Sequence, residues 1–208
     1  MKMKLKNLLI QIKLNIFQYQ LNIKINIEKI NNGINNKNPK NFFKIVFLGD
    51  SGVGSKTSLV KIIIEDIFDP NIVSTNGASL FYKTIYSKNG KAFLLNICDT
   101  AGQERLRELS KMFYYDADCI VLGYDITRKV SFESIDNYRY PISKKISSAN
   151  LFYLIGNKTD LYDQEEVPES EAREYAKNNN MRFFKISCKC KTGINEFLED
   201  LAEELEKF

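Results

Sequence analysis

The segment Gly49-Asp50-Ser51-Gly52-Val53-Gly54-Ser55-Lys56-Thr57 lies between an apolar run at residues 42–48 and a helical pattern at residues 59–64. A strand, a glycine-rich loop and a helix in this order are the context of a phosphate-binding loop. Glycines let the backbone curl so that its N–H groups point at phosphate oxygens, and the helix adds the positive end of its dipole. We therefore predict that this segment and Ser58 bind phosphates.

The spacing of this loop departs by one residue from the pattern G-x-x-x-x-G-K-[ST]. That pattern places Lys six residues after the first Gly, whereas Lys56 lies seven residues after Gly49, so that Ser55 is most simply the extra residue. One residue adds up to ~3.8 Å of chain, and the loop must bulge outward or rotate Lys56 by ~100° at the helix start. We expect Lys56 to reach the β- and γ-phosphates and Thr57 to ligate Mg²⁺. For this loop alone, a turn that binds no nucleotide is the alternative.

A second loop, Asp99-Thr100-Ala101-Gly102-Gln103-Glu104, follows a strand-like run at residues 91–98. An Asp at a strand end beside a phosphate loop can hold Mg²⁺ through a water, which is the role expected of Asp99. Gly102 can offer a backbone N–H to a γ-phosphate, and Gln103 can orient an attacking water.

Two further loops suit a guanine base. Asn157-Lys158-Thr159-Asp160 follows a strand-like run, and the carboxylate of Asp160 can accept from both the N1–H and the 2-amino group of guanine. Adenine offers neither donor in that arrangement. Asn157 is expected to tether the base side of the pocket, and the stem of Lys158 to lie over the ring. After the last strand, Ser187-Cys188-Lys189 can close the base pocket through its backbone and its Lys; alone, it reads as a surface turn.

Strand-like and helical runs alternate along the chain after residue 41. The strands are expected at residues 42–48, 79–87, 91–98, 119–124, 151–156 and 182–186, and the later helices at 130–147, 169–178 and 193–207. Asn89-Gly90 is a tight hairpin signal between the second and third strands. The alternation predicts an α/β fold with parallel βαβ units and helices on both faces of an open sheet. Such sheets bind ligands at the carboxyl ends of their strands.

Composition excludes several classes of site. The 208 residues include four Cys and no His, which excludes His-based acid–base catalysis and most zinc sites. Residues 1–44 hold nine Lys and one acidic residue, whereas residues 45–208 carry a net charge of −4, so the body does not predict nucleic-acid binding. Residues 1–41, rich in Lys, Asn and Ile, are expected to be a poorly ordered extension, with a basic arm that contacts anionic lipid or a partner as the alternative.

Four such loops at strand ends, in this order, resemble the small GTPases of the Ras superfamily over residues 42–208, and Rab-type members most closely. The resemblance implies a P-loop NTPase fold, the small G domain, with a mostly parallel six-stranded sheet. It implies GTP or GDP with Mg²⁺ as ligands, and Thr75 as the switch I residue that ligates Mg²⁺ and senses the γ-phosphate. Phe68 matches an aromatic residue that packs against guanine. Gln103, Lys56 and Thr75 would be the catalytic residues.

By this resemblance the protein is a guanine-nucleotide switch with a low GTPase rate that regulates vesicle trafficking through effectors, an exchange factor and a GTPase-activating protein. It would be cytoplasmic, with transient residence at endomembranes. Cys98 stands where the family usually has Trp, which implies a different effector set. The sequence stops at Phe208 without the prenylated Cys of the family, so we expect no prenyl anchor and at most weak membrane contact through the basic arm; a G domain of a longer protein is the alternative. The competing function is a nucleotide-impaired interaction module on the same fold.

Overall fold

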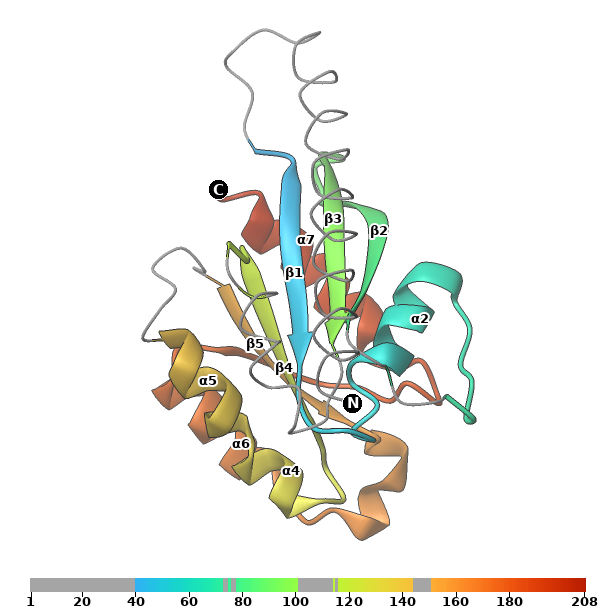
Figure 1. Cartoon of the computed structure of the whole chain (residues 1–208), viewed down its shortest axis with the longest axis vertical. Helices are drawn as coiled ribbons and strands as arrows, with labels where there is room; N and C mark the ends of the chain where they lie inside the picture. Colours follow the sequence, from blue (N-terminus) through green and yellow to red (C-terminus); the bar gives the residue numbers. More distant parts are fainter. Residues whose placement is uncertain (1–39, 73–74, 76–77, 101–113, 115, 144–150) are drawn as a thin grey trace, which may run out of the picture. The chain divides into compact units, whose positions relative to one another are not determined.

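A six-stranded sheet forms the centre of the part of the chain that the computed structural model describes, residues 40–72, 75, 78–100, 114, 116–143 and 151–208 (Figure 1). Its strands are β1 (Phe42–Leu48), β2 (Ala78–Tyr86), β3 (Ala92–Thr100), β4 (Cys119–Asp125), β5 (Leu151–Asn157) and β6 (Arg182–Lys185). Their order across the sheet is β2-β3-β1-β4-β5-β6. Among these six described strands, β2 alone runs antiparallel to its neighbour, β3, and the other pairs are parallel. The predicted mostly parallel six-stranded sheet is confirmed.

The helices follow the strands as the alternating pattern predicts. They are α2 (Thr57–Glu65), α4 (Lys129–Glu133), α5 (Ile135–Ser143), α6 (Glu169–Asn178) and α7 (Ile194–Leu205), with a 3₁₀ helix η2 (Thr159–Gln164) after β5. The hairpin between β2 and β3 closes where Asn-Gly predicts it, because Gly90 donates its N–H to the carbonyl of Ser87 at 2.9 Å.

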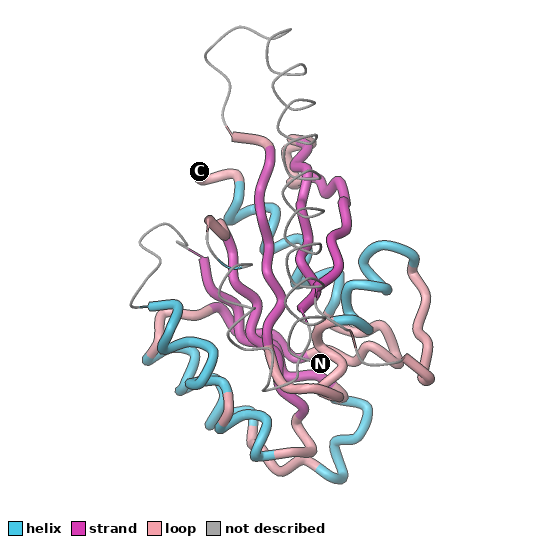
Figure 2. The backbone as a smooth tube through the Cα atoms, in the orientation of Figure 1, coloured by secondary structure: helices cyan, strands magenta, loops and turns pink. Residues whose placement is uncertain are grey.

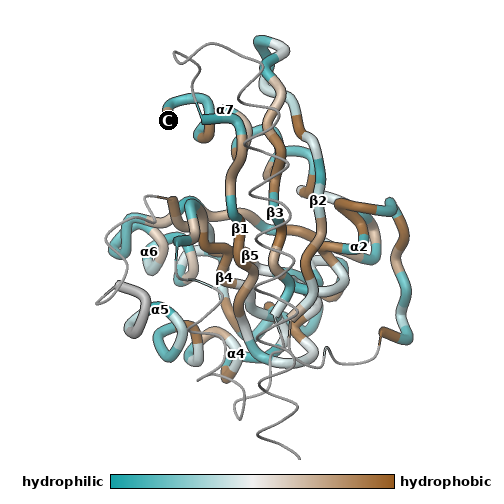
Figure 3. The backbone as a smooth tube through the Cα atoms, turned by 45° about the horizontal axis from the view of Figure 1, so that its top comes forward, coloured by the Kyte–Doolittle hydropathy of each residue, from teal (hydrophilic) through white to brown (hydrophobic). Residues whose placement is uncertain are grey.

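Two apolar layers cover the faces of the sheet. On one face, α2 and α7 pack through residues such as Leu59 and Phe197. On the other, α4, α5 and α6 pack through Phe132, Tyr138 and Ala172. Strands β1 and β4 are buried on both faces, which is why they read as continuous apolar runs rather than alternating ones. The tube in Figure 2 and the hydropathy colours in Figure 3 show central, largely apolar strands with helices outside them.

The helix predicted at residues 130–147 is two helices within the described residues. Helix α4 ends at Glu133 and α5 begins at Ile135, with Ser134 between them. The hydroxyl of Ser131 donates to the carbonyl of Arg128 at 2.6 Å, and that of Ser134 donates to the carbonyl of Ser131 at 3.0 Å. Serine hydroxyls that bond to nearby carbonyls compete with the regular helix, which accounts for the break.

Residues 41–208 form one compact unit. Asn41 already joins the sheet, since its carbonyl accepts from the N–H of Leu94 at 2.8 Å. Residues 1–39 of the predicted extension lie outside the described residues. None of the helices in the described ranges has the length and apolar character that a membrane crossing needs.

We predict that Phe197→Ala lowers the free energy of unfolding by about 3–5 kcal/mol, because the ring is fully buried and its loss leaves a cavity. The ring lies edge-on to Tyr153 at 5.1 Å between centroids. Urea unfolding checks this, with Tyr162→Ala as the control, since Tyr162 is 69% exposed and its loss should change stability by less than about 0.5 kcal/mol. Equal effects of the two variants would contradict the packing described here.

Candidate functional site

Loops from four strand ends meet at one pocket with a volume of ≈ 360 Å³. The loops follow β1, β3, β5 and β6, at the carboxyl edge of the sheet where an α/β fold places ligands. In Figure 2 this edge is where loops gather below β1 and beside α2. The pocket is therefore at the place that the strand order predicts.

Six of the residues predicted to bind phosphates line the pocket: Ser51, Gly52, Gly54, Lys56, Thr57 and Ser58. Gly49, Asp50, Val53 and Ser55 of the same loop are not among its lining residues. Gly54 has φ +72°, and a Cβ there would lie 2.6 Å from Nδ2 of Asn157. The loop needs glycine at this position because both the backbone conformation and the neighbouring amide exclude a side chain.

Lys56 reaches back over the loop that precedes it. Its side chain is buried, and Nζ donates to the backbone carbonyl of Asp50. Burial lowers the pKa of Lys56 to about 8, against the opposing attraction of Asp99 and Asp50. A buried cation held beside a glycine-rich loop and a helix start is suited to bind an anion such as phosphate.

Ser55, the residue that the spacing marks as extra, is buried. Its exposed fraction is 1%, so the expected outward bulge is wrong, and Lys56 lines the pocket. The rotation of Lys56 stays a prediction. Helix α2 begins at Thr57, and Lys56 has non-helical dihedral angles of φ −111° and ψ −97°. The additional length is absorbed on the sheet side of the loop, where a buried serine has room.

The three predicted Mg²⁺ ligands lie together. The hydroxyls of Thr57 and Thr75 are 2.8 Å apart, and Oδ2 of Asp99 accepts from Thr57 at 2.8 Å and from Thr75 at 3.2 Å. Burial raises the pKa of Asp99, against the effect of these hydrogen bonds and of Lys56. Oδ1 of Asp99 is buried and has no hydrogen-bond partner among the described residues. Two hydroxyls and a buried, under-satisfied carboxylate fit a hard cation that prefers oxygen ligands.

Asn157, the last residue of β5, joins the phosphate loop to the last of the four loops. Its Nδ2 donates to the carbonyl of Val53 at 3.0 Å, and its Oδ1 accepts from the N–H of Cys188 at 3.1 Å. The thiol of Cys188 contacts the carbonyl of Gly54 at 3.5 Å, and burial raises the pKa of this thiol to about 12. Asn157 therefore acts on the pocket by positioning its walls.

The carboxylate of Asp160, predicted to accept hydrogen bonds from guanine, is held by two residues of the last loop. Asp160 accepts from the hydroxyl of Ser187 at 2.5 Å through Oδ1, and Lys189 lies 4.0 Å from Oδ2. Ser187 is not among the lining residues, whereas Asp160, Cys188 and Lys189 are. The last loop thus orients the carboxylate of Asp160 at the pocket.

Phe68 and Lys158 also line the pocket. Phe68 is half-buried and packs against the apolar layer on the α2 and α7 face, so it serves as a loop anchor while it faces the pocket. Lys158 has a left-handed backbone, with φ +69°, and its Nζ lies 2.6 Å from Oδ2 of Asp125. Gly102 and Gln103, predicted to act on the γ-phosphate and the attacking water, lie outside the described residues.

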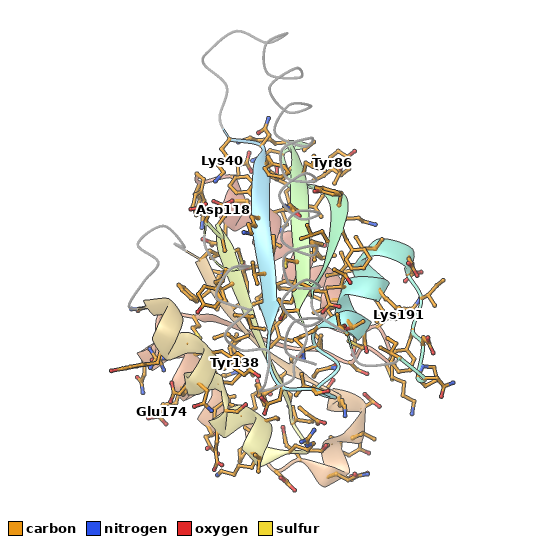
Figure 4. The ribbon with its side chains drawn as sticks, viewed as in Figure 1. Lys40, Tyr86, Asp118, Tyr138, Glu174 and Lys191 are labelled. Carbon is orange, nitrogen blue, oxygen red and sulfur yellow. The ribbon has the colours of Figure 1, made fainter. Side chains whose placement is uncertain are left out.

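Sequence reasoning missed three supporting residues. Asp125 is fully buried and holds Lys158. Tyr138 of α5 donates its hydroxyl to Oδ1 of Asp50 at 2.8 Å, and Figure 4 shows it beside the end of β1. Lys191 donates to the carbonyl and to Oδ1 of Asp66, at the end of α2 (2.6 and 2.7 Å). The partners of Tyr138 and Lys191 lie 88 and 125 residues away, so no local pattern marks them.

Known proteins similar to this chain identify its family. The model of the Ras family matches residues 44–207. Ras-related protein Rab-13 of Canis lupus familiaris is 37% identical, over 78% of this chain and 79% of its own. Rab-2B of Dictyostelium discoideum is 37% identical over 81% and 82%, and Rab-7a of Paramecium octaurelia 39% over 79% and 81%. The fold and the site define a P-loop α/β protein, and the chain belongs to the Ras family of small GTPases, with Rab-type relatives.

We predict that Asn157→Ala lowers the free energy of unfolding by about 2 kcal/mol or more, because it leaves two buried backbone groups without partners. Urea unfolding of the nucleotide-free protein measures this. Asn89→Ala is the control, since Asn89 is exposed and its side chain donates to Glu206 at the surface. A loss no greater than that of Asn89→Ala would show that Asn157 does not hold the loops together.

Proposed function

We propose that the protein is a guanine-nucleotide switch that binds GTP and GDP with Mg²⁺ and hydrolyses GTP slowly. The observation that carries the proposal is one pocket lined both by a guanine-type acceptor, Asp160, and by a glycine-rich loop with a buried lysine, Lys56. A guanine nucleotide carries a base for the first and a polyphosphate for the second.

Base selection is assigned to the two loops after β5 and β6. Asp160 presents a carboxylate that can accept two hydrogen bonds from guanine, and Ser187 holds one of its oxygens in position. The alkyl stem of Lys158 lies along the pocket wall while Asp125 neutralises its charge. An adenine base would leave the carboxylate of Asp160 without its donors, which disfavours ATP.

Phosphate binding is assigned to the loop and the start of α2. Lys56 supplies a buried positive charge, and the backbone N–H groups around Gly54 supply donors beside the positive end of the helix dipole. Thr57, Thr75 and Asp99 would hold Mg²⁺, Asp99 through a water. Bound Mg²⁺ would neutralise charge on the β- and γ-phosphates.

Hydrolysis would be catalysed by positioning and electrostatics, which needs no histidine. We assign Lys56 and Thr75 to the phosphate side of the reaction and Gln103 to the orientation of the attacking water, with Gly102 donating to the γ-phosphate. Intrinsic rates of such sites are on the order of 10⁻⁴ s⁻¹, and a partner's arginine raises them by roughly 10⁵.

We further propose that the two nucleotide states expose different surfaces around Thr75 and around the loop after Asp99, and that effector proteins distinguish these states. An exchange factor and a GTPase-activating protein would set the balance between the states. The Rab-type relatives support a role in vesicle trafficking, in the cytoplasm with transient residence at endomembranes.

A nucleotide-impaired interaction module is the second candidate, because Ser55 lengthens the phosphate loop.

The test is a titration of the full-length chain with GTP, GDP and ATP, with and without Mg²⁺, followed by single-turnover GTP hydrolysis. We expect tight, Mg²⁺-dependent binding that is selective for guanine, followed by slow release of phosphate. Guanine nucleotide binding without hydrolysis would limit the protein to a binding module. Absence of binding would favour the interaction module.

We predict that Asp160→Ala weakens GDP binding by on the order of 10²-fold or more, because two hydrogen bonds to a charged acceptor are lost. Preference for GDP over ADP should fall with it. Fluorescence titration with N-methylanthraniloyl-GDP measures both. Asp163→Ala is the matched control, since Asp163 lies exposed in η2 and does not line the pocket.

We predict that Gln103→Leu lowers the rate of GTP hydrolysis by on the order of 10- to 10²-fold, because the attacking water loses its orientation. GDP affinity should change less than about threefold, since Gln103 is assigned no contact with GDP. Single-turnover hydrolysis and GDP titration separate the two effects. An unchanged hydrolysis rate would remove Gln103 from the mechanism.

A further inference from the structure

The side chain of Ser55 lies between the phosphate loop and strand β4. Its exposed fraction is 1%, and it is absent from the pocket lining although its neighbours Gly54 and Lys56 are both there. Its hydroxyl is buried without a hydrogen-bond partner among the described residues. Ser55 is therefore held by the space around it rather than by a polar contact.

That space exists because Gly123 has no side chain. A Cβ on Gly123 would lie 1.7 Å from Oγ of Ser55 and 2.5 Å from its Cβ. Both distances are far below van der Waals contact, so Ser55 occupies the volume that any larger residue at 123 would need. Since the hydroxyl of Ser55 has no hydrogen-bond partner among the described residues, packing against Gly123 accounts for the position of this side chain.

Strand pairing brings the loop to this position. β1 and β4 pair in parallel with Leu48 opposite Leu122, so Gly49, directly after β1, comes beside Gly123 within β4. A Cβ on Gly49 would lie 2.3 Å from the carbonyl of Gly123, which shows how closely the two backbones approach. The phosphate loop therefore leaves β1 directly over Gly123.

Backbone conformation does not by itself demand glycine at 123. Gly123 is not among the described residues with positive φ, unlike Gly49, Gly52 and Gly54. An alanine at 123 would be acceptable to the strand, and only the side chain of Ser55 excludes it.

We propose that Ser55 and Gly123 are a matched pair of positioning residues. Gly123 admits the extra residue of the phosphate loop on the sheet side, and this leaves Lys56 and Thr57 facing the pocket. The lengthened loop is thus compatible with nucleotide binding as long as residue 123 is glycine. The nucleotide part of this inference rests on the proposed function, whereas the fit between the two residues stands by itself.

The experiment compares full-length wild type with Gly123→Ala, Ser55→Gly and the double variant. Ser55→Gly removes the clashing atoms and keeps the loop length. Asn89→Gly in the Gly123→Ala background is the matched control, because it adds the same backbone freedom at an exposed position that does not line the pocket. The readouts are the thermal midpoint without nucleotide, the affinity for N-methylanthraniloyl-GDP, and the ³¹P shift of the β-phosphate of bound GDP.

We expect Gly123→Ala to lower the thermal midpoint, to weaken GDP binding roughly 5- to 150-fold and to move the β-phosphate resonance. The double variant should regain most of each loss, and the Asn89→Gly control none. If Gly123→Ala alone does not fold, recovery of a folded, GDP-binding double variant supports the pair equally.

Two results would overturn the proposal. One is a Gly123→Ala variant that matches wild type in all three readouts. The other is a double variant no better than Gly123→Ala. If wild type binds no GDP, the proposed function fails, and rescue of the thermal midpoint still decides whether Ser55 and Gly123 are paired.

Discussion

The buried amide of Asn157 connects parts of the chain that are more than thirty residues away from it on either side. It donates to the carbonyl of Val53 in the phosphate loop and accepts from Cys188 in the last loop, and both bonds are buried. Buried polar groups of the backbone cost free energy when they are left unpaired. Separating the two loops from Asn157 would leave such groups without partners, so these bonds stabilise the closed arrangement. The pocket between these loops depends on the two hydrogen bonds of Asn157, because they join loops that follow two different strands.

Charge is the second determinant of the site. Burial raises the pKa of Asp99 and lowers that of Lys56, and the two side chains attract each other. Both pKa shifts arise because burial disfavours the charged form of the side chain, and a ligand of opposite charge would offset that cost. In the proposed function, a polyphosphate with a divalent cation would bring negative charge toward Lys56 and positive charge toward Asp99, and would compensate both groups. Such a site would need no histidine.

The number of residues in the phosphate loop does not determine on which side of the loop its extra residue lies. The spacing from Gly49 to Lys56 identifies one extra residue and leaves its direction open. Burial of Ser55 over Gly123 settles the direction in the structure, since a glycine 68 residues later leaves the required space. The other supporting contacts, Tyr138 to Asp50 and Lys191 to Asp66, are of the same kind and have no local signature.

The sequence alone determined the order of strands and helices, the loops at the strand ends and most residues of the pocket. These follow from local signals: apolar runs, glycine spacing, Asn-Gly turns and polar side chains directly after strands. Tertiary structure alone decided that Thr57, Thr75 and Asp99 meet, that Asn157 closes the pocket and that Ser55 turns inward. The reason is physical: periodicity reports which face of an element is buried, whereas contacts between distant loops depend on strand register and on the volume left by other side chains.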